Sequence, residues 1–483
     1  MGGFVVQDLD GKLIKTLSGT QYLLTEKIGE GAQGVVYDEA MDRFLVKLYK
    51  KGTPIQDNNR LQKLRWLQIQ NYPDQFIKPL EIIKEPMVGY VMKKVKGHVP
   101  LNRLLIPPRG DYISEWYNAQ TGGLRRRFFL GYKIAMQFAL LHESNRAYCD
   151  ISGSNILVNA DPSIASVCMI DIDNIYIPGG DSGNILGTSR YMAPEIINRQ
   201  MEPDIFTDDY SLAVILFELL TTGHPYVGDM VIDGTPEMQT QAYLGLYPYI
   251  DDPQVEINKP SQMLPVEAVM TMKIRRLFRQ TFVKGKDNRM ERVPARDLAL
   301  AFLEASNLVM KCPVCGNWHI AKKGAKGYDC PWCDDINQRP SFLQFKDRFD
   351  VDMPGTLVPD EQIRKDVGVI SFVLRDEVNS VTDNYVSNMY IKRDKFSKPV
   401  DQYFVIRKAK NGKFYIINSG NNELYLQKAK QKSIVPVTKG DEPIEISRGD
   451  VIYFENITKK RKTVIKESDG QFKGILFRYA IVR

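Results

Sequence analysis

A glycine-rich segment near the N-terminus strongly constrains the fold of this 483-residue chain. Residues 29–36, GEGAQGVV, fit the pattern G-x-G-x-x-G-x-V. Because glycine has no side chain, the backbone amides of such a loop can approach a phosphate group closely. The dinucleotide-binding pattern requires a strand before the loop and a helix after it, whereas here strand-like sequence lies on both sides. The segment therefore predicts a phosphate-binding hairpin, with a plain glycine-rich hairpin as the alternative.

Several short motifs follow the glycine loop in order, and they decide between these alternatives. They are FLVK ending at Lys47, YCDISGSNILV at 148–158, MIDID at 169–173, GTSRYMAPE at 187–195 and DDYSLA at 208–213. An ordered set of this kind at these separations does not arise by chance. Residues of about 22–305 thereby resemble a eukaryotic-like Ser/Thr protein kinase domain of the bacterial type. The resemblance implies two lobes, with ATP and Mg²⁺ (or Mn²⁺) bound between them.

The resemblance assigns catalytic roles to four residues. Asp150 would accept the proton of the substrate hydroxyl, and Lys47 would contact the α- and β-phosphates. Asn155 and Asp171 would hold magnesium, since hard cations prefer oxygen ligands. Thr188, in GTSRYMAPE, implies Ser and Thr rather than Tyr as acceptors.

The same resemblance implies a nucleotide-binding surface and two structural contacts. Met92 would be the gatekeeper beside the adenine, and Glu195 would pair with Arg292. Asp208 would brace the catalytic loop from within a core helix. The cofactor-binding residues are Ile28, Gly29, Gly31, Gly34, Val36, Lys47, Met92, Lys93, Val95 and Leu157.

The chain departs from the family pattern around the catalytic aspartate. Tyr148-Cys149 replaces the usual His-Arg, and the missing arginine predicts activity that does not depend on phosphorylation of the 174–189 loop. Ser152 replaces a lysine that would neutralise charge on the γ-phosphate, which predicts slower transfer. Asp173 replaces the glycine of the Asp-Phe-Gly triplet and adds a carboxylate near the metal.

The predicted helix after Lys47 raises the main doubt about activity. An active kinase holds this lysine with a helix glutamate. The helix that the apolar spacing predicts at 60–69 contains no glutamate. Gln62 is the candidate for that place, and its neutral amide could donate or accept a hydrogen bond without supplying charge. The metal and base positions are retained. We therefore expect an active, non-standard enzyme, with a nucleotide-binding pseudokinase adaptor as the alternative.

Two cysteine pairs follow the kinase-like region. The spacing C-x₂-C-x₁₄-C-x₂-C suits two knuckles that close one tetrahedral Zn²⁺ site with four thiolates, Cys312, Cys315, Cys330 and Cys333. Such a closed site predicts a structural role, with iron or a disulfide pair as the alternatives. His319 could compete as a ligand, but we expect it at the surface.

The net charge of +7 belongs to the C-terminal end. Residues 340–483 carry 26 Lys and Arg against 19 Asp and Glu, and the remainder is neutral. Short strand-like runs with Gly, Asn and Asp between them predict an all-β module there. The basic excess predicts an acidic or phosphorylated protein partner.

This module resembles the second half of a forkhead-associated domain, a β-sandwich that binds phosphothreonine peptides. The runs KFYIINSGNNELY at 413–425 and PIEISRGDVIYF at 443–454 carry the resemblance. It nominates Arg393, Ser397 and Asn421 for phosphopeptide binding. The basic run at 459–462 favours nucleic acid only weakly, because no aromatic residues alternate with the charges.

The expected architecture is multidomain. An N-terminal β extension (1–21) precedes an α+β bilobal kinase domain (22–306), a zinc ribbon (307–336), a linker (337–365) and an all-β sandwich (366–483). The module order resembles that of bacterial kinases found with von Willebrand-type and metal-dependent phosphatase partners. The most apolar stretch, 211–220, is too short to cross a bilayer and contains Glu218. We therefore expect a cytoplasmic enzyme with protein substrates and without a membrane or nucleic-acid partner.

Overall fold

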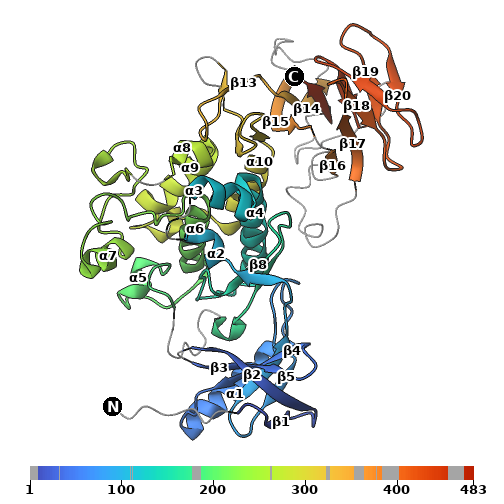
Figure 1. Cartoon of the computed structure of the whole chain (residues 1–483). Coiled ribbons are helices and arrows are strands. Elements are labelled where there is room, and N and C mark those ends of the chain that lie inside the picture. Colours follow the sequence, from blue (N-terminus) through green and yellow to red (C-terminus); the bar gives the residue numbers. More distant parts are fainter. Residues whose placement is uncertain are drawn as a thin grey trace. The chain divides into compact units, whose positions relative to one another are not determined.

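The chain divides into two compact units, Met1–Phe302 and Leu303–Arg483 (Figure 1). The computed structural model describes residues 9–31, 33–108, 110, 112–176, 187–261, 264–322, 327–352, 364–376, 378–382, 402–454 and 473–483. Within these residues, no helix is both long enough and apolar enough to cross a membrane.

The first unit begins with a six-stranded antiparallel sheet, in the order β1-β2-β3-β4-β6-β5. Buried side chains from its strands form one apolar core that includes Leu24, Tyr37 and Val46. Because β1 pairs with β2, residues of the expected N-terminal extension belong to this sheet. The strands are β1 (Leu13–Lys15), β2 (Gln21–Glu30), β3 (Gly34–Glu39), β4 (Phe44–Tyr49), β5 (Glu81–Ile83) and β6 (Gly89–Lys93).

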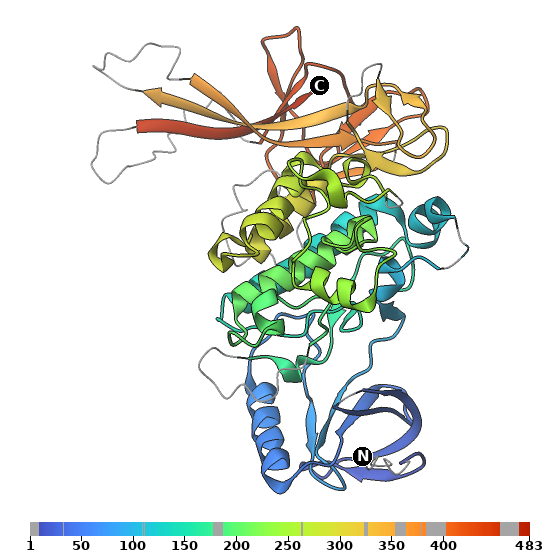
Figure 2. The ribbon, with the colours of Figure 1, turned by 90° about the vertical axis from the view of Figure 1, so that its left-hand side faces the viewer.

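One long helix, α1 (Pro54–Ile69), lies beside this sheet (Figure 2). The helix begins at Pro54 rather than at Arg60 because Thr53 caps it: the Thr53 hydroxyl accepts the Gln56 amide, and the Gln56 side chain accepts the Thr53 amide. Its apolar face is narrow, with only Leu64 and Leu67 buried.

The rest of the first unit is mainly helical. Every residue of α6 from Thr207 to Thr221 is buried, as expected for a helix surrounded by others. A Cβ at Gly131 of α4 would lie 2.2 Å from the Phe302 ring of α10, so glycine permits this close approach. The elements are β7 (His98–Pro100), α2 (Asn102–Leu105), α3 (Ile113–Glu115), η1 (Trp116–Gln120), α4 (Gly123–His142), β8 (Ile156–Asn159), β9 (Val167–Met169), η2 (Ile172–Asn174), α5 (Pro194–Ile197), α6 (Ile205–Thr221), α7 (Pro236–Tyr243), η3 (Glu256–Asn258), α8 (Val266–Val269), α9 (Met272–Arg279), η4 (Gln280–Lys284), η5 (Arg289–Glu291) and α10 (Ala295–Ser306).

The second unit opens with two short hairpins that carry the cysteine pairs. They are β10 (Val309–Lys311) with β11 (Trp318–Ile320), and β12 (Tyr328–Asp329) with β13 (Ile336–Asn337). The buried Arg375 guanidinium joins the first hairpin to the following sheet, since it donates to the carbonyls of Ser306 (2.8 Å) and Val309 (3.2 Å).

Beyond the hairpins, the described residues form two antiparallel sheets around one apolar core, as the all-β expectation requires. The sheet orders are β15-β14-β23-β22-β19-β20 and β16-β17-β18-β21. Three long strands, β14, β15 and β23, run side by side in Figure 2. The strands are β14 (Ser341–Asp352), β15 (Arg364–Leu374), β16 (Asn379–Thr382), β17 (Gln402–Lys408), β18 (Phe414–Ile417), β19 (Tyr425–Gln427), β20 (Ile434–Pro436), β21 (Ile444–Ile446), β22 (Val451–Tyr453) and β23 (Lys473–Val482).

The expected linker at 337–365 is wrong over much of its length. β14 lies between β15 and β23 and pairs with both, so it is an interior strand of the larger sheet. Leu343 and Phe345 enter the core, and their alternation with polar residues is the strand pattern that the prolines of this segment obscured.

Two of the residues nominated for phosphopeptide binding, Arg393 and Ser397, lie outside the described residues, as does the basic run at 459–462. The third, Asn421, is exposed, and its side-chain oxygen accepts from the Lys439 ammonium at 3.5 Å.

Candidate functional site

The glycine loop connects β2 to β3 as a hairpin. Gly29 lies opposite Val36, and the Gly31 amide donates to the Gly34 carbonyl at 2.9 Å. A Cβ at Gly34 would lie 2.3 Å from the Leu48 carbonyl oxygen, so packing against β4 requires glycine there. A Cβ at Gly29 or Gly31 would meet no atom within 4 Å, which leaves open space beside the loop.

Lys47, on β4, is buried within a cluster of charges. Its ammonium donates to Asp171 Oδ1 at 3.1 Å and to both carboxylate oxygens of Asp173, at 3.2 and 3.0 Å. The Tyr49 hydroxyl donates to Asp173 Oδ2 at 2.7 Å. Burial alone would raise the pKa of Asp173, but the Lys47 charge and the Tyr49 hydroxyl hold it below its usual value.

Asp150 and Asn155 lie together in the loop between α4 and β8. The Asn155 amide nitrogen donates to the Asp150 carboxylate at 2.8 Å and to the Asp150 carbonyl at 2.9 Å. These two bonds orient the carboxylate. Burial raises the pKa of Asp150, which makes the group a stronger base than an exposed aspartate.

The metal positions present oxygen atoms, as Mg²⁺ requires. Asn155 uses its nitrogen on Asp150 and so retains its side-chain oxygen as a ligand atom. Asp171 follows β9 with a positive φ of 58°, and its side chain is 32% exposed, against 4% for Asp173. Burial raises the pKa of Asp171, and the charges of Asp171 and Asp173 add to the effect of burial in raising the pKa of Asp150. An amide oxygen and a carboxylate fit a hard divalent cation.

The predicted adenine-binding residues lie on β2, β3, β6, the residues after β6, and β8. Met92 is buried on β6 opposite Leu45 of β4, and Leu157 lies on β8. Ile28 is 47% exposed and Val36 is half-buried, which leaves both available to cover a ligand. Lys93, which is exposed, and Val95, which is half-buried, flank Lys94, whose ammonium pairs with Asp38 and Asp42.

The loop that carries Asp150 is held from the core by α6. The Asp208 carboxylate accepts the backbone amides of Tyr148 (2.5 Å) and Cys149 (3.0 Å), which confirms its predicted bracing role. The Tyr148 ring, which replaces the usual histidine, is fully buried, and its hydroxyl donates to the Ile170 carbonyl.

Ser152, in place of the family lysine, is buried, and its hydroxyl lies 2.9 Å from that of Ser154. It lines a cavity of about 410 Å³ whose other walls include Thr188 and Arg190. The Arg190 guanidinium donates to the buried Glu218 carboxylate at 2.6 Å, so this cation is already paired within the protein.

The candidate for the missing helix glutamate, Gln62, is wrong. Gln62 is exposed on α1, and among the described residues the side-chain acceptors of Lys47 are Asp171 and Asp173. Sequence reasoning placed Asp173 near the metal and missed Tyr49. The sequence contained a signal for Tyr49, because it lies two residues after Lys47 and its side chain is therefore on the same face of β4.

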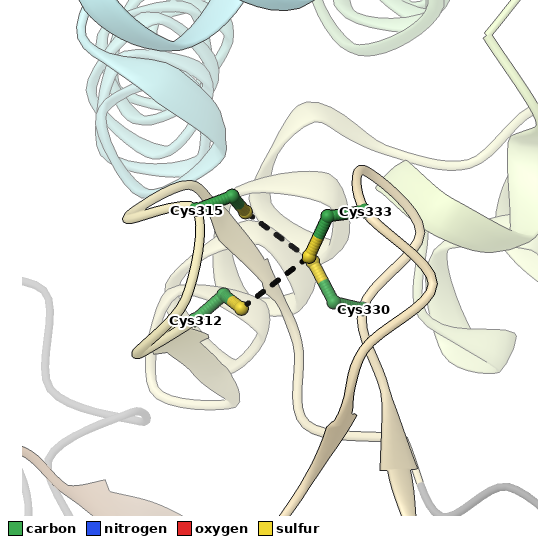
Figure 3. A group of neighbouring side chains, drawn as sticks. All are labelled: Cys312, Cys315, Cys330 and Cys333. Atoms are coloured by element: carbon green, nitrogen blue, oxygen red, sulfur yellow. Dashed lines mark hydrogen bonds between the residues drawn. The ribbon is translucent and has the colours of Figure 1, made fainter.

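The four cysteines of the two pairs converge, and their side chains point towards one another (Figure 3). The Cys312 and Cys333 sulfurs are 3.8 Å apart, and those of Cys315 and Cys330 are 3.7 Å apart. Four thiolates at about 2.3 Å from a tetrahedral Zn²⁺ have sulfurs about 3.8 Å apart, whereas a disulfide needs about 2.05 Å. The donor set therefore fits zinc and excludes a disulfide pair in this geometry.

His319 is fully buried on β11, so the expectation that it lies at the surface is wrong. One ring nitrogen lies 3.0 Å from the Ile320 carbonyl oxygen, and the other lies 3.3 Å from the Asn337 amide nitrogen. Because the Asn337 oxygen in turn accepts from Cys312, the ring packs behind the cysteine cluster and is not part of it.

A protein kinase domain family model matches residues 22–292. The chain is also similar to the Aurora kinase of Saccharomyces cerevisiae, with 26% identity over 232 residues, 45% of this chain and 57% of that protein. It matches the serine/threonine-protein kinase Sgk1-A of Xenopus laevis at 27% identity over 198 residues, 40% and 38% of the two chains.

A probable serine/threonine-protein kinase, MARK-A of Dictyostelium discoideum, matches at 22% identity over 219 residues, 44% of this chain and 19% of that protein. The matched segments thus span less than two thirds of each of these three relatives. The family model covers more than half of the 483 residues. The chain belongs to the protein kinase family.

Proposed function

We propose that the chain is an ATP- and Mg²⁺-dependent Ser/Thr protein kinase that transfers the γ-phosphoryl group to a protein hydroxyl. The observation that carries the proposal is the oriented, partly desolvated Asp150, held by Asn155 and by the loop that Asp208 braces. Asp150 accepts the hydroxyl proton while the hydroxyl oxygen bonds to phosphorus and ADP leaves. Lys47 binds the α- and β-phosphates.

Asn155 and Asp171 would hold the cation, which supplies positive charge to the phosphates when it is bound. Their amide and carboxylate oxygens are the right donor types for it. Ser152 supplies no cation beside the γ-phosphate, so we expect transfer to be slower than in relatives with lysine there.

Transfer of labelled phosphate from Mg²⁺-ATP to a general acceptor protein tests the proposal. Asp150→Asn keeps the hydrogen bond to Asn155 sterically possible but removes the base, and the rate should fall about 10²–10⁴-fold. Asp161→Asn is the matched control, because Asp161 is an exposed loop aspartate whose partner is Ser163. Equal transfer by the wild type and Asp150→Asn would contradict the proposal.

A pseudokinase adaptor is the second candidate, and the helix without a glutamate and the buried Ser152 favour it. In that case the wild type would bind Mg²⁺-ATP with measurable affinity, and its transfer would not exceed that of Asp150→Asn.

We further infer that the four cysteines hold one structural Zn²⁺ and that the C-terminal β module recruits a partner. The two sheets around a shared core support a forkhead-associated-like sandwich, and the basic excess of residues 340–483 favours an acidic or phosphorylated protein. The module order extends this proposal to von Willebrand-type and metal-dependent phosphatase proteins. Binding of a phosphothreonine peptide, compared with its unphosphorylated form, tests the recruiting role.

A further inference from the structure

Both oxygens of the Asp173 carboxylate accept hydrogen bonds from side chains of β4. Both of its oxygens accept from the Lys47 ammonium, and Oδ2 also accepts from the Tyr49 hydroxyl. Its side chain is only 4% exposed, and that of Lys47 is only 6% exposed. Asp171 also accepts from Lys47, at 3.1 Å, but through one oxygen and from a side chain that is 32% exposed, so Asp173 is the buried partner of this cation. Loss of a buried partner is costly for the charge that remains.

The helix that normally supplies this carboxylate offers no alternative. The sequence of α1 is PIQDNNRLQKLRWLQI, whose one acidic residue, Asp57, lies in the first turn. The Asp57 carboxylate accepts from the Arg60 guanidinium at 2.9 Å and from the Gly52 amide. It is therefore engaged at the start of the helix and is not a partner of Lys47.

We propose that Asp173, held by Tyr49, replaces the helix glutamate and positions Lys47 for the nucleotide phosphates. The proposal rests on the proposed function, in which Lys47 contacts those phosphates. Asp173 acts through Lys47 and is a positioning residue, whereas Asp171, with its more exposed side chain, remains the metal-binding carboxylate.

This arrangement changes which element assembles the site. Asp173 lies on the short helix η2, two residues after Asp171, so the segment that holds the metal ligand also anchors the lysine. The next residue, Asn174, accepts a hydrogen bond from the Gln33 side chain at 3.0 Å, which joins η2 to the glycine loop. Assembly of the site thus depends on η2, and among the described residues α1 supplies no carboxylate to Lys47.

A double-mutant cycle with Asp173→Asn and Lys47→Met separates positioning from an independent role. Mg²⁺-ATP affinity, phosphate transfer and the Mg²⁺ midpoint are measured for all four proteins. Alone, Asp173→Asn should reduce transfer about 10²-fold, because a displaced lysine no longer meets the phosphates. In the Lys47→Met background the same change should cost less than about threefold, since the two residues act as a unit.

If Asp173→Asn folds poorly, two conservative variants and one control still test the proposal. Tyr49→Phe removes one hydrogen bond to Asp173 and should give a smaller loss, and Asp173→Glu should restore part of the rate. Gln62→Ala on the exposed face of α1 should leave affinity and transfer unchanged. Thermal unfolding of each variant reports folding separately.

Two outcomes would overturn the proposal. Equal losses from Asp173→Asn in both backgrounds would show that it acts independently of Lys47. A raised Mg²⁺ midpoint for Asp173→Asn in both backgrounds would make it a metal ligand. If the wild type binds Mg²⁺-ATP but transfers no phosphate, the proposed function fails. The Mg²⁺-ATP affinities of the four proteins in the cycle then still show whether Asp173 acts through Lys47. A wild type that binds no nucleotide would overturn both proposals.

Discussion

The Asp208 carboxylate accepts the backbone amide of Cys149 at 3.0 Å, across 59 residues of sequence. Cys149 has a φ of 71°, in the left-handed region that side chains other than glycine rarely adopt. The residue immediately before Asp150 is thus held in an unfavourable conformation by a hydrogen bond that its amide donates to the core helix α6. Strain of about 1–3 kcal/mol at such a position persists only when surrounding contacts enforce it.

Asp208→Asn should therefore loosen the loop that carries Asp150. The amide can accept only one of the two backbone N–H groups, so we expect the free energy of unfolding to fall by about 1–3 kcal/mol. Transfer should fall at least about tenfold, because Asp150 loses its fixed position. Urea unfolding and the transfer assay measure the two effects. Asp161→Asn should change neither, and unchanged transfer by Asp208→Asn would refute the bracing role.

The Arg292–Glu195 pair should matter for stability. The Arg292 guanidinium donates to both Glu195 oxygens, at 2.7 and 2.8 Å, and its side chain is only 1% exposed. Glu195→Gln leaves a buried cation without its counter-charge, and we expect a loss of about 3–5 kcal/mol in the free energy of unfolding. Arg275→Gln is the matched control, since Arg275 pairs with Asp251 with a 26% exposed side chain and should cost less.

The sequence predicted the parts of this site that are local. The glycine hairpin and the strand that carries Lys47 follow from motifs whose residue types and spacing allow few arrangements. The Arg292–Glu195 contact, across 97 residues, was predicted only because the family resemblance implies it. The capped start of α1 could also have been found, because Thr53, Pro54 and Gln56 form a recognisable N-terminus.

The parts that depend on three-dimensional packing could not be predicted. No spacing rule connects Asp173 to Lys47, 126 residues away, so Gln62 was chosen only because the family uses that helix. Likewise, β14 was mistaken for a linker because prolines surround it, although its pairing with β15 and β23 defines it as an interior strand. His319 was placed at the surface because the sequence does not show that Asn337 lies beside it.

A buried acidic pair beside His142 predicts a pH-dependent stability. Burial raises the pKa of Asp209 to about 7, with the Asp208 charge adding to the effect, while His142 and the Ala295 amide act in the opposite direction. The folded chain therefore binds this proton more tightly than the unfolded chain does. Its stabilising contribution is complete below the unfolded pKa of about 3.9 and is lost as pH rises through about 7, at no more than about 1.4 kcal/mol per pH unit.

Asp209→Asn isolates this contribution, because other buried groups titrate in the same range. The pKa of His224, for example, is lowered by burial, so its effect on stability has the opposite sign. The free energy of unfolding of the wild type minus that of Asp209→Asn should decrease from pH 5 to pH 8. A difference that is constant or that increases over this range would contradict the raised pKa of Asp209.

Removal of the metal should unfold the two cysteine hairpins. Cys312 and Cys330 are each 1% exposed, and among the described residues of 307–337 few other apolar side chains are buried with them. We therefore expect the proposed zinc ion to stabilise this segment, as metal does in small zinc domains. We expect one zinc per chain by elemental analysis, and loss of that zinc in Cys330→Ser. Limited proteolysis should then cut within 307–337.

The control variant Cys168→Ser, which changes a half-buried cysteine outside the cluster, should keep its zinc. A chain that contains no zinc yet resists cleavage there would disprove the structural role.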